Sequence, residues 1–239
     1  MLWGGLTDQY TIRARIVPSL LIALPVGLAA LACFPNGPSS WNAAWGLGVW
    51  GVASVLLGQL GRHAGKRKEP RLFERWGGAP TTRCLRHNGA KNYTILERTH
   101  KKLKALMRTK IPTRTEETAD PATADEVYEA CIRFLRDKTR DRKKFNLVFE
   151  ENCNYGFCRN LWGLKPLGLT ITILALVAIG TLALVDREAS TMASMVRFLI
   201  PGVLTLLILL GWLFVVTPRW VQVPAEAYAD RLLEALERL

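Results

Sequence analysis

The side chains best suited to bind a ligand in this chain of 239 residues are basic and lie near its middle. They fall on two neighbouring stretches and form one predicted patch: Arg83, Arg86, His87, Lys91, Lys101, Lys102, Lys104 and Arg108. Cationic groups gathered in this way attract phosphate, so the expected ligand is anionic, a nucleotide or a nucleic acid. The alternative interpretation is a solvated basic surface with no specific ligand.

A second candidate site combines amides, an aromatic ring and a guanidinium group further along the chain. It comprises Asn152, Asn154, Tyr155, Arg159 and Asn160. Aromatic and amide groups can stack on a base and hydrogen-bond to it, while an arginine can hold the phosphate. The competing interpretation is that this segment packs a soluble domain against the end of a membrane helix.

Enzyme motifs are absent from the sequence. The stretch GRHAGK, which starts at Gly61, is too short for a phosphate-binding loop, and Arg67 follows it where Ser or Thr is needed. No GxSxG, HExxH or HRD stretch occurs. We therefore expect a protein that is not an enzyme.

The five cysteines allow one metal hypothesis. Cys84 and His87 have the spacing of two zinc ligands, and Cys153 with Cys158 could complete a set of four. Reduced thiols are the rule in the cytosol, so the simpler interpretation is free cysteines with no metal and no cofactor.

The charge of the chain is concentrated in one segment between apolar stretches. Residues 61–165 hold 25 of the 32 Lys and Arg residues and 13 of the 20 Asp and Glu residues, which gives the whole net charge of +12. The flanking stretches, each long enough to span a bilayer as a helix, are 16–34, 41–60, 167–185 and 197–217. We expect an all-α membrane protein in which two transmembrane helical hairpins, four spans in total, flank a basic, mainly helical cytoplasmic domain. The expected domains are residues 1–60, 61–165, 166–217 and the tail 218–239.

The positions of the bases predict the orientation in the membrane. Several follow the second stretch directly: Arg62, Lys66, Arg67, Lys68, Arg71 and Arg75. Because bases close to a span stay on the cytoplasmic side, both termini should be cytoplasmic in a bacterial inner membrane. A cleaved signal peptide is the alternative for the first stretch, but its length and the second stretch directly after it favour a span.

Small residues recur on one face of the second stretch, at Ala44, Gly48, Gly51 and Gly58. Small residues let helices approach closely in lipid, so this face predicts a helix interface. It would pack within the hairpin, or between subunits around a pore. Gln59, at the cytoplasmic end, is an interface amide in one interpretation and part of a gate in the other.

The hydrophilic residues divide into three predicted parts. Residues 91–108 have the pattern of an amphipathic helix, and 111–122 read as a linker. Thr123 and Glu126 have the spacing of a capping box that starts the next helix. The tail from residue 224 predicts a short amphipathic helix that packs on the central domain or on a neighbouring copy.

This layout is similar to that of small four-span membrane effectors of bacterial anti-phage defence systems, in the plan of the chain rather than in its residues. The resemblance implies a homo-oligomeric channel or membrane-disrupting effector in antiviral defence, gated by an anionic cytoplasmic ligand such as a nucleotide. The alternative is a membrane-anchored module that recruits nucleic acid or a separate partner protein without conducting ions.

Overall fold

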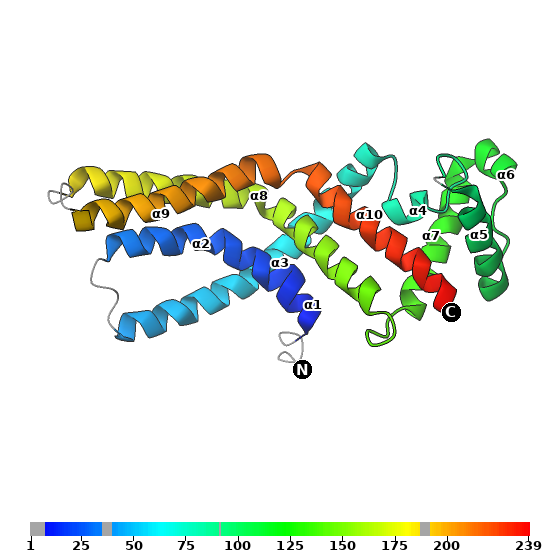
Figure 1. The fold of residues 1–239 in the computed structure, drawn as a ribbon, viewed down its shortest axis with the longest axis horizontal. Helices are drawn as coiled ribbons and strands as arrows, with labels where there is room; N and C mark the ends of the chain where they lie inside the picture. Colours follow the sequence, from blue (N-terminus) through cyan, green and yellow to red (C-terminus); the bar gives the residue numbers. More distant parts are fainter. Residues whose placement is uncertain (1–7, 35–39, 91, 187–191) are drawn as a thin grey trace. The chain divides into compact units, whose positions relative to one another are not determined.

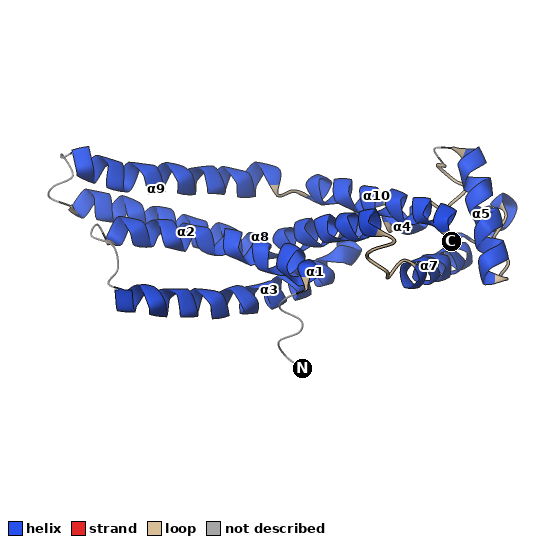
Figure 2. Ribbon diagram, turned by 60° about the horizontal axis from the view of Figure 1, so that its bottom comes forward, coloured by secondary structure: helices blue, strands red, loops and turns tan. Residues whose placement is uncertain are grey.

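The computed structural model describes residues 8–34, 40–90, 92–186 and 192–239, and the described part is helical with no strand (Figures 1 and 2). Its contacts divide the chain into two compact units. Unit 1 is Met1–Glu69 with Gly156–Val221, and unit 2 is Pro70–Tyr155 with Gln222–Leu239. The domain limits that we expect from the charge pattern rest on composition and not on contacts, and they stay a prediction.

Unit 1 is built from the apolar helices. Its elements are α1 (Gln9–Thr11), the π-helical turn η1 (Ile12–Ile16), α2 (Val17–Cys33), the first part of α3 (Ser40–Trp76), the later part of α8 (Asn146–Val185), α9 (Met192–Leu210) and a second π-helical turn, η2 (Gly211–Val215). Helices α2 and α9 lie side by side (Figure 1). The two buried clusters of this unit are Ile22, Leu161, Leu164, Trp212 and Val216, and Ala32, Ile179 and Phe198.

Three helical stretches in the described residues are long and apolar enough to cross a membrane: Gln9–Cys33, Asn146–Val185 and Met195–Val215. Their outer faces expose large apolar side chains, and Leu31, Leu174 and Phe214 show 62, 62 and 74% of their surface. Such faces are typical of helices in lipid. These stretches contain the predicted third span, all but the last residue of the predicted first and most of the predicted fourth.

The predicted second span, residues 41–60, lies within the long helix α3. The side chains at 40–45, 47 and 48 are outside the described part, so Ala44 and Gly48 of the predicted small-residue face are too. The four-span count and the hairpin arrangement therefore stay predictions.

Unit 2 consists of shorter amphipathic helices. It contains the end of α3, α4 (Pro80–Arg83), α5 (Tyr93–Met107), α6 (Arg114–Ala119), α7 (Pro121–Lys138), the start of α8, most of α10 (Pro218–Glu234) and the 3-10 turn η3 (Ala235–Arg238). Its fully buried side chains include Leu85, Leu103, Tyr128, Leu135, Leu232 and Leu236. The predicted helix at 91–108 is confirmed as α5, which starts where the Asn92 side chain accepts a hydrogen bond from the N–H of Ile95 (3.1 Å).

Two sequence interpretations in unit 2 are wrong. The expected linker contains α6, which starts with a capping box between Thr113 and Glu116. Helix α7 then begins at Pro121, and Asp120 caps it by accepting from the N–H of Thr123 (3.1 Å). The Thr123–Glu126 spacing does not mark the start, because proline at the first helical position has no N–H to satisfy and a φ already suited to a helix.

Candidate functional site

The bases of the predicted patch have different roles in unit 2. Arg86 has a structural role, because it bonds to other parts of the unit. Its Nε and Nη2 donate to the two carboxylate oxygens of Asp125 on α7 (2.7 and 2.5 Å), and its Nη1 donates to the carbonyl of Gly77 (2.6 Å). This bidentate hydrogen bond raises the pKa of Arg86. At Gly78 (φ +124°) a Cβ would lie 2.8 Å from Nη2 of Arg86, so glycine fits there. Each of the three nitrogens of this guanidinium therefore already donates to the protein.

His87 takes part in an internal network around the buried carboxylate of Glu117. The backbone N–H groups of His87 and Asn88 donate to its two oxygens (2.7 and 2.9 Å), and the Tyr128 hydroxyl donates to it as well (2.7 Å). The ring of His87 meets the ring of His100 edge-on, with centroids 4.9 Å apart. These contacts hold the turn after α4 against α6 and α7, so His87 belongs to the scaffold.

The carboxylate and imidazole in this network both have shifted pKa values. Burial raises the pKa of Glu117, but the hydrogen bonds from Asn88, His87 and Tyr128 lower it below its ordinary value. Burial lowers the pKa of His100, although its hydrogen bond to the Leu85 carbonyl (2.8 Å) opposes this. The folded unit therefore favours a charged carboxylate beside a neutral imidazole.

The bases of α5 remain at the surface. Lys101, Lys104 and Arg108 are exposed, and the described residues form no hydrogen bond or ion pair with their side chains. Lys102 is half-buried and pairs with Glu237 (2.6 Å), as does Arg98 from the preceding turn (2.5 Å). Lys91 lies outside the described residues.

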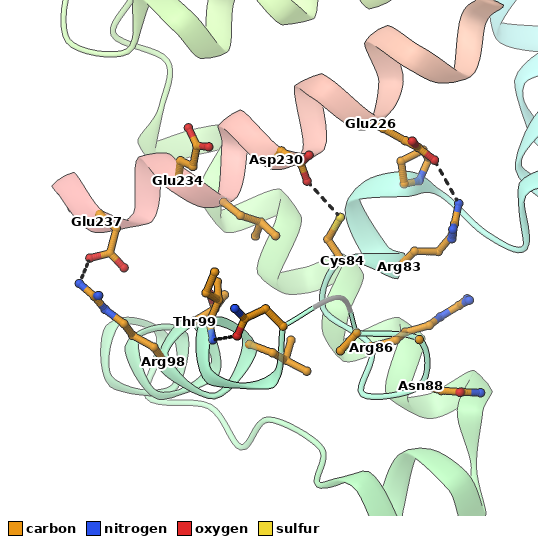
Figure 3. Close-up of a pocket in the computed structure, with 17 residues that line it drawn as sticks. Arg83, Cys84, Arg86, Asn88, Arg98, Thr99, Glu226, Asp230, Glu234 and Glu237 are labelled. Carbon is orange, nitrogen blue, oxygen red and sulfur yellow. Dashed lines mark hydrogen bonds and ion pairs between the residues drawn. The ribbon is translucent and has the colours of Figure 1, made fainter. Parts of the chain in front are cut away.

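A cavity of about 600 Å³ lies beside these bases, between α10 and the α4–α5 region (Figure 3). One wall is a stripe of acids on α10 and η3: Glu226, Asp230, Glu234 and Glu237. The opposite wall carries Arg83, which pairs with Glu226 (3.7 Å), and Arg98. In the middle, the Cys84 thiol donates to Asp230 (3.8 Å). The predicted amphipathic tail is confirmed as a helix, but its acids facing the bases were not expected.

The residues of the second predicted site differ in exposure, so they do not form one surface. Asn154 is exposed and donates to Glu151 (3.3 Å), whereas Tyr155 is buried and stacks on Tyr228 of α10 with ring centroids 6.5 Å apart. Asn152 is partly exposed. Arg159 and Asn160 are 8 and 1% exposed within unit 1. A buried arginine and amide cannot form an open surface for a base and a phosphate.

Arg159 and Asn160 instead connect the helices of unit 1. Arg159 pairs with Glu69 of α3 (3.0 Å) and donates to the side-chain oxygen of Asn160 (3.3 and 3.4 Å). Asn160 donates to the carbonyl of Ala14, within the π-helical turn η1 (2.6 Å). Lys165 of α8 donates to the Val216 carbonyl at the end of the other π-helical turn, η2 (2.8 Å). Polar side chains of α8 thus satisfy backbone carbonyls at both π-helical turns.

Glycines bring α3 and α8 into close contact in the same region. A Cβ on Gly163 would lie 2.8 Å from the Cα of Gly65, so neither position accepts a side chain in this arrangement. Of the predicted helix-packing residues, Gly58 faces the backbone at Arg15, where an added Cβ would lie 3.2 Å from the carbonyl oxygen. Gly51 faces open space and Gln59 is exposed. The sequence signal for this crossing is the spacing of four residues between Gly61 and Gly65, two small residues on one face of α3.

The thiols do not assemble into a metal centre in the described part of the chain. No group of three or more His, Cys, Asp and Glu side chains there could hold a metal ion. None of the five cysteines, all of which are described, forms a disulfide, and burial raises the pKa of Cys131 to about 11, which makes it a poor nucleophile.

Comparisons with protein-family models, with curated proteins and with solved structures found no match.

Proposed function

We propose that this protein is a homo-oligomeric membrane channel or membrane-disrupting effector, gated by a phosphate-bearing ligand that binds the exposed bases of α5. The ligand is a nucleotide or a nucleic acid in the cytoplasm, and the membrane is the bacterial inner membrane with both termini inside. Anti-phage defence is the setting that the layout of the chain favours.

The observation that carries this proposal is the unpaired state of three bases on one helix. Lys101, Lys104 and Arg108 follow each other at intervals of three and four residues, so they share one face of α5 and its end. Like charges at this spacing repel each other, and the described residues form no ion pair with any of the three. A bound polyanion would relieve that repulsion, whereas Arg83, Arg86, His87 and Lys102 already have partners within the protein.

Helix α8 supports the gating part of the proposal. Its Tyr155 packs in unit 2 and its Arg159 and Asn160 pair in unit 1, so one continuous helix carries contacts of both units. Asn160 also donates a hydrogen bond to the carbonyl of Ala14 in the π-helical turn η1. Such turns are frequent at functional sites. A ligand that shifts the packing of unit 2 has a direct covalent route to the membrane helices.

The spans support the oligomer. In the described residues, the predicted spans carry no charged side chain beyond Arg197 at the start of the fourth, and they expose large apolar residues that cannot line a wet pore within one subunit. Several copies around an axis would enclose such a pore.

The test is ion flux from liposomes that contain the purified protein, with and without a short single-stranded oligonucleotide inside or outside. We expect flux only with the oligonucleotide, and loss of both binding and flux in the triple variant Lys101→Ala, Lys104→Ala, Arg108→Ala. The matched control removes three exposed bases elsewhere, Arg136→Ala, Arg140→Ala and Lys143→Ala, and should behave as wild type. A monomeric protein in several detergents, or no flux under any condition, would refute the channel.

A membrane-anchored binding module is the second candidate. The close glycine contact of α3 with α8 and the buried Arg159–Glu69 pair favour it, because a tightly packed crossing is suited to a static anchor. In that case the oligonucleotide binds through the same three bases, and no flux follows.

A further inference from the structure

Two bases of α5 converge on a single oxygen atom of the C-terminal segment. The Nη2 of Arg98 and the Nζ of Lys102, one helical turn apart, lie 2.5 and 2.6 Å from Oε2 of Glu237 (the arginine contact is drawn in Figure 3). Hydrogen bonding from Lys102, with the nearby charge of Arg98, lowers the pKa of this carboxyl, so it is an anion. Two cationic donors aimed at one oxyanion form the arrangement that a phosphate oxygen takes.

Glu237, which accepts from both bases, is one of four neighbouring carboxylates whose negative charges repel each other. Glu226, Asp230, Glu234 and Glu237 succeed each other at intervals of four, four and three residues, which places them on one side of the helix. Arg83 contacts the stripe at one end, and Arg98 with Lys102 at the other. The apolar side of the same segment is held separately, because Ala229, Leu232 and Leu236 are buried. Displacement of the Glu237 side chain therefore does not require the helix to leave its place.

We infer that Arg98 and Lys102 form a subsite for a phosphate group, and that the Glu237 carboxylate occupies it as an internal competitor. This inference rests on the proposed function and names a second contact for the same ligand, next to Lys101, Lys104 and Arg108. A phosphate presents more charge and more acceptor oxygens than a carboxylate, so it displaces Glu237 once it is bound locally. The internal competitor keeps the subsite closed to weakly charged anions.

The test measures binding of a fluorescent single-stranded oligonucleotide to the full-length protein in nanodiscs of phosphatidylcholine, with inorganic pyrophosphate as the small competitor. Glu237→Gln keeps the shape of the side chain and removes the competing charge. We expect it to tighten binding roughly two- to fivefold, the range of an exposed ion pair. Pyrophosphate should compete better against this variant than against wild type.

Glu234→Gln is the matched control. It removes the same charge from the wall of the same cavity, but this carboxylate pairs with Arg231 of its own helix (2.6 Å). Equal tightening in both variants would mean that only the general charge of the tail matters, and it would overturn the subsite. So would wild-type binding by the double variant Arg98→Ala, Lys102→Ala.

Tighter oligonucleotide binding by Glu237→Gln is a result that misfolding of the variant and the proposed function alone do not predict. Because the matched Glu234→Gln control removes the same charge, a gain confined to Glu237→Gln cannot come from general loosening of the tail, and binding is measured without any ion flux. If the Lys101, Lys104 and Arg108 variant loses binding while Glu237→Gln equals wild type, the proposed function stands and the subsite fails. Nanodiscs with phosphatidylglycerol identify the source of the phosphate: loss of the Glu237→Gln effect there would assign the subsite to a lipid headgroup.

Discussion

The two units use the same basic side chains in opposite ways. In unit 1, Arg159 is buried, and its guanidinium is held by Glu69 of another helix and by Asn160. In unit 2, Arg98 and Lys102 reach the surface and share one exposed acid from the end of the chain. The difference teaches that burial and partner, not residue type, decide whether a base maintains the structure or remains free to exchange its partner.

The energies follow the same division. Removal of one partner from a buried pair leaves an uncompensated charge, which costs several kcal/mol, about 3 to 5. An exposed pair contributes much less, because water and salt screen it and two long side chains must be ordered to form it. An anionic ligand can therefore compete for Arg98 and Lys102 but not for Arg159.

The largest expected effect tests this contrast directly. Glu69→Ala should lower the free energy of unfolding by about 3 kcal/mol, because the buried Arg159 loses its counter-ion. The measurement is denaturant-induced unfolding in a mild detergent, followed by tryptophan fluorescence. Glu237→Ala, which removes the exposed partner in unit 2, should leave the unfolding midpoint unchanged. Similar losses in the two variants would break the comparison.

The next effect sharpens the description of unit 1 as a close-packed crossing. Gly163→Ala places a methyl group against the backbone of Gly65 and should cost about 2 kcal/mol through overpacking. Gly180→Ala is the control on the same helix: a Cβ there meets nothing within 4 Å, and alanine favours the helix. We expect the control to keep or slightly raise the unfolding midpoint. A crossing that tolerates both substitutions equally would not be close-packed.

The smallest effect concerns Glu117, a charged side chain of unit 2 that is buried like Arg159 of unit 1. Glu117→Gln should destabilise the unit by about 1 to 2 kcal/mol, because the N–H groups of His87 and Asn88 lose an ionised acceptor. Glu126→Gln, an exposed acid on α7, should keep the wild-type midpoint in the same denaturant experiment.

The stability of unit 2 should fall as the pH is lowered, because both His100 and Glu117 have lowered pKa values. His100 has a lowered pKa, so protonation favours the unfolded chain and stability begins to fall below about pH 6.5. Glu117 also has a lowered pKa, so its contribution is present above its ordinary 4.5 and is lost as the pH falls through the folded value. Both terms act in the same direction. The Glu117→Gln variant should lose only the second part of the acid destabilisation, and a wild-type profile below pH 4.5 would contradict the role of this carboxylate.

The start of α5 could be predicted from adjacent residues. The start of α7 could not, because the same capping pattern occurs twice before or within that helix and only one copy forms a cap. Asn92 follows the rule for a helix cap, and the apolar spacing after it gave α5 to within two residues at its start. The Thr-x-x-Glu pattern occurs at both Thr113 and Thr123, and only the first forms a capping box. Asp120 and Pro121, between the two, start the second helix instead.

The apolar stretches and the concentration of bases in 61–165 were determined by the sequence, because hydropathy and helical periodicity are properties of contiguous residues. The pairing of those bases was decided only by the tertiary structure. Glu237 is 135 residues from Lys102, and Ala14 is 146 residues from Asn160, so no local pattern could join them. An ion pair or a side-chain hydrogen bond acts over a few ångströms of space, and the fold alone brings distant parts of a chain that close. That is why the basic patch was visible in the sequence, while the acids that pair with Arg83, Arg86 and Lys102 were not.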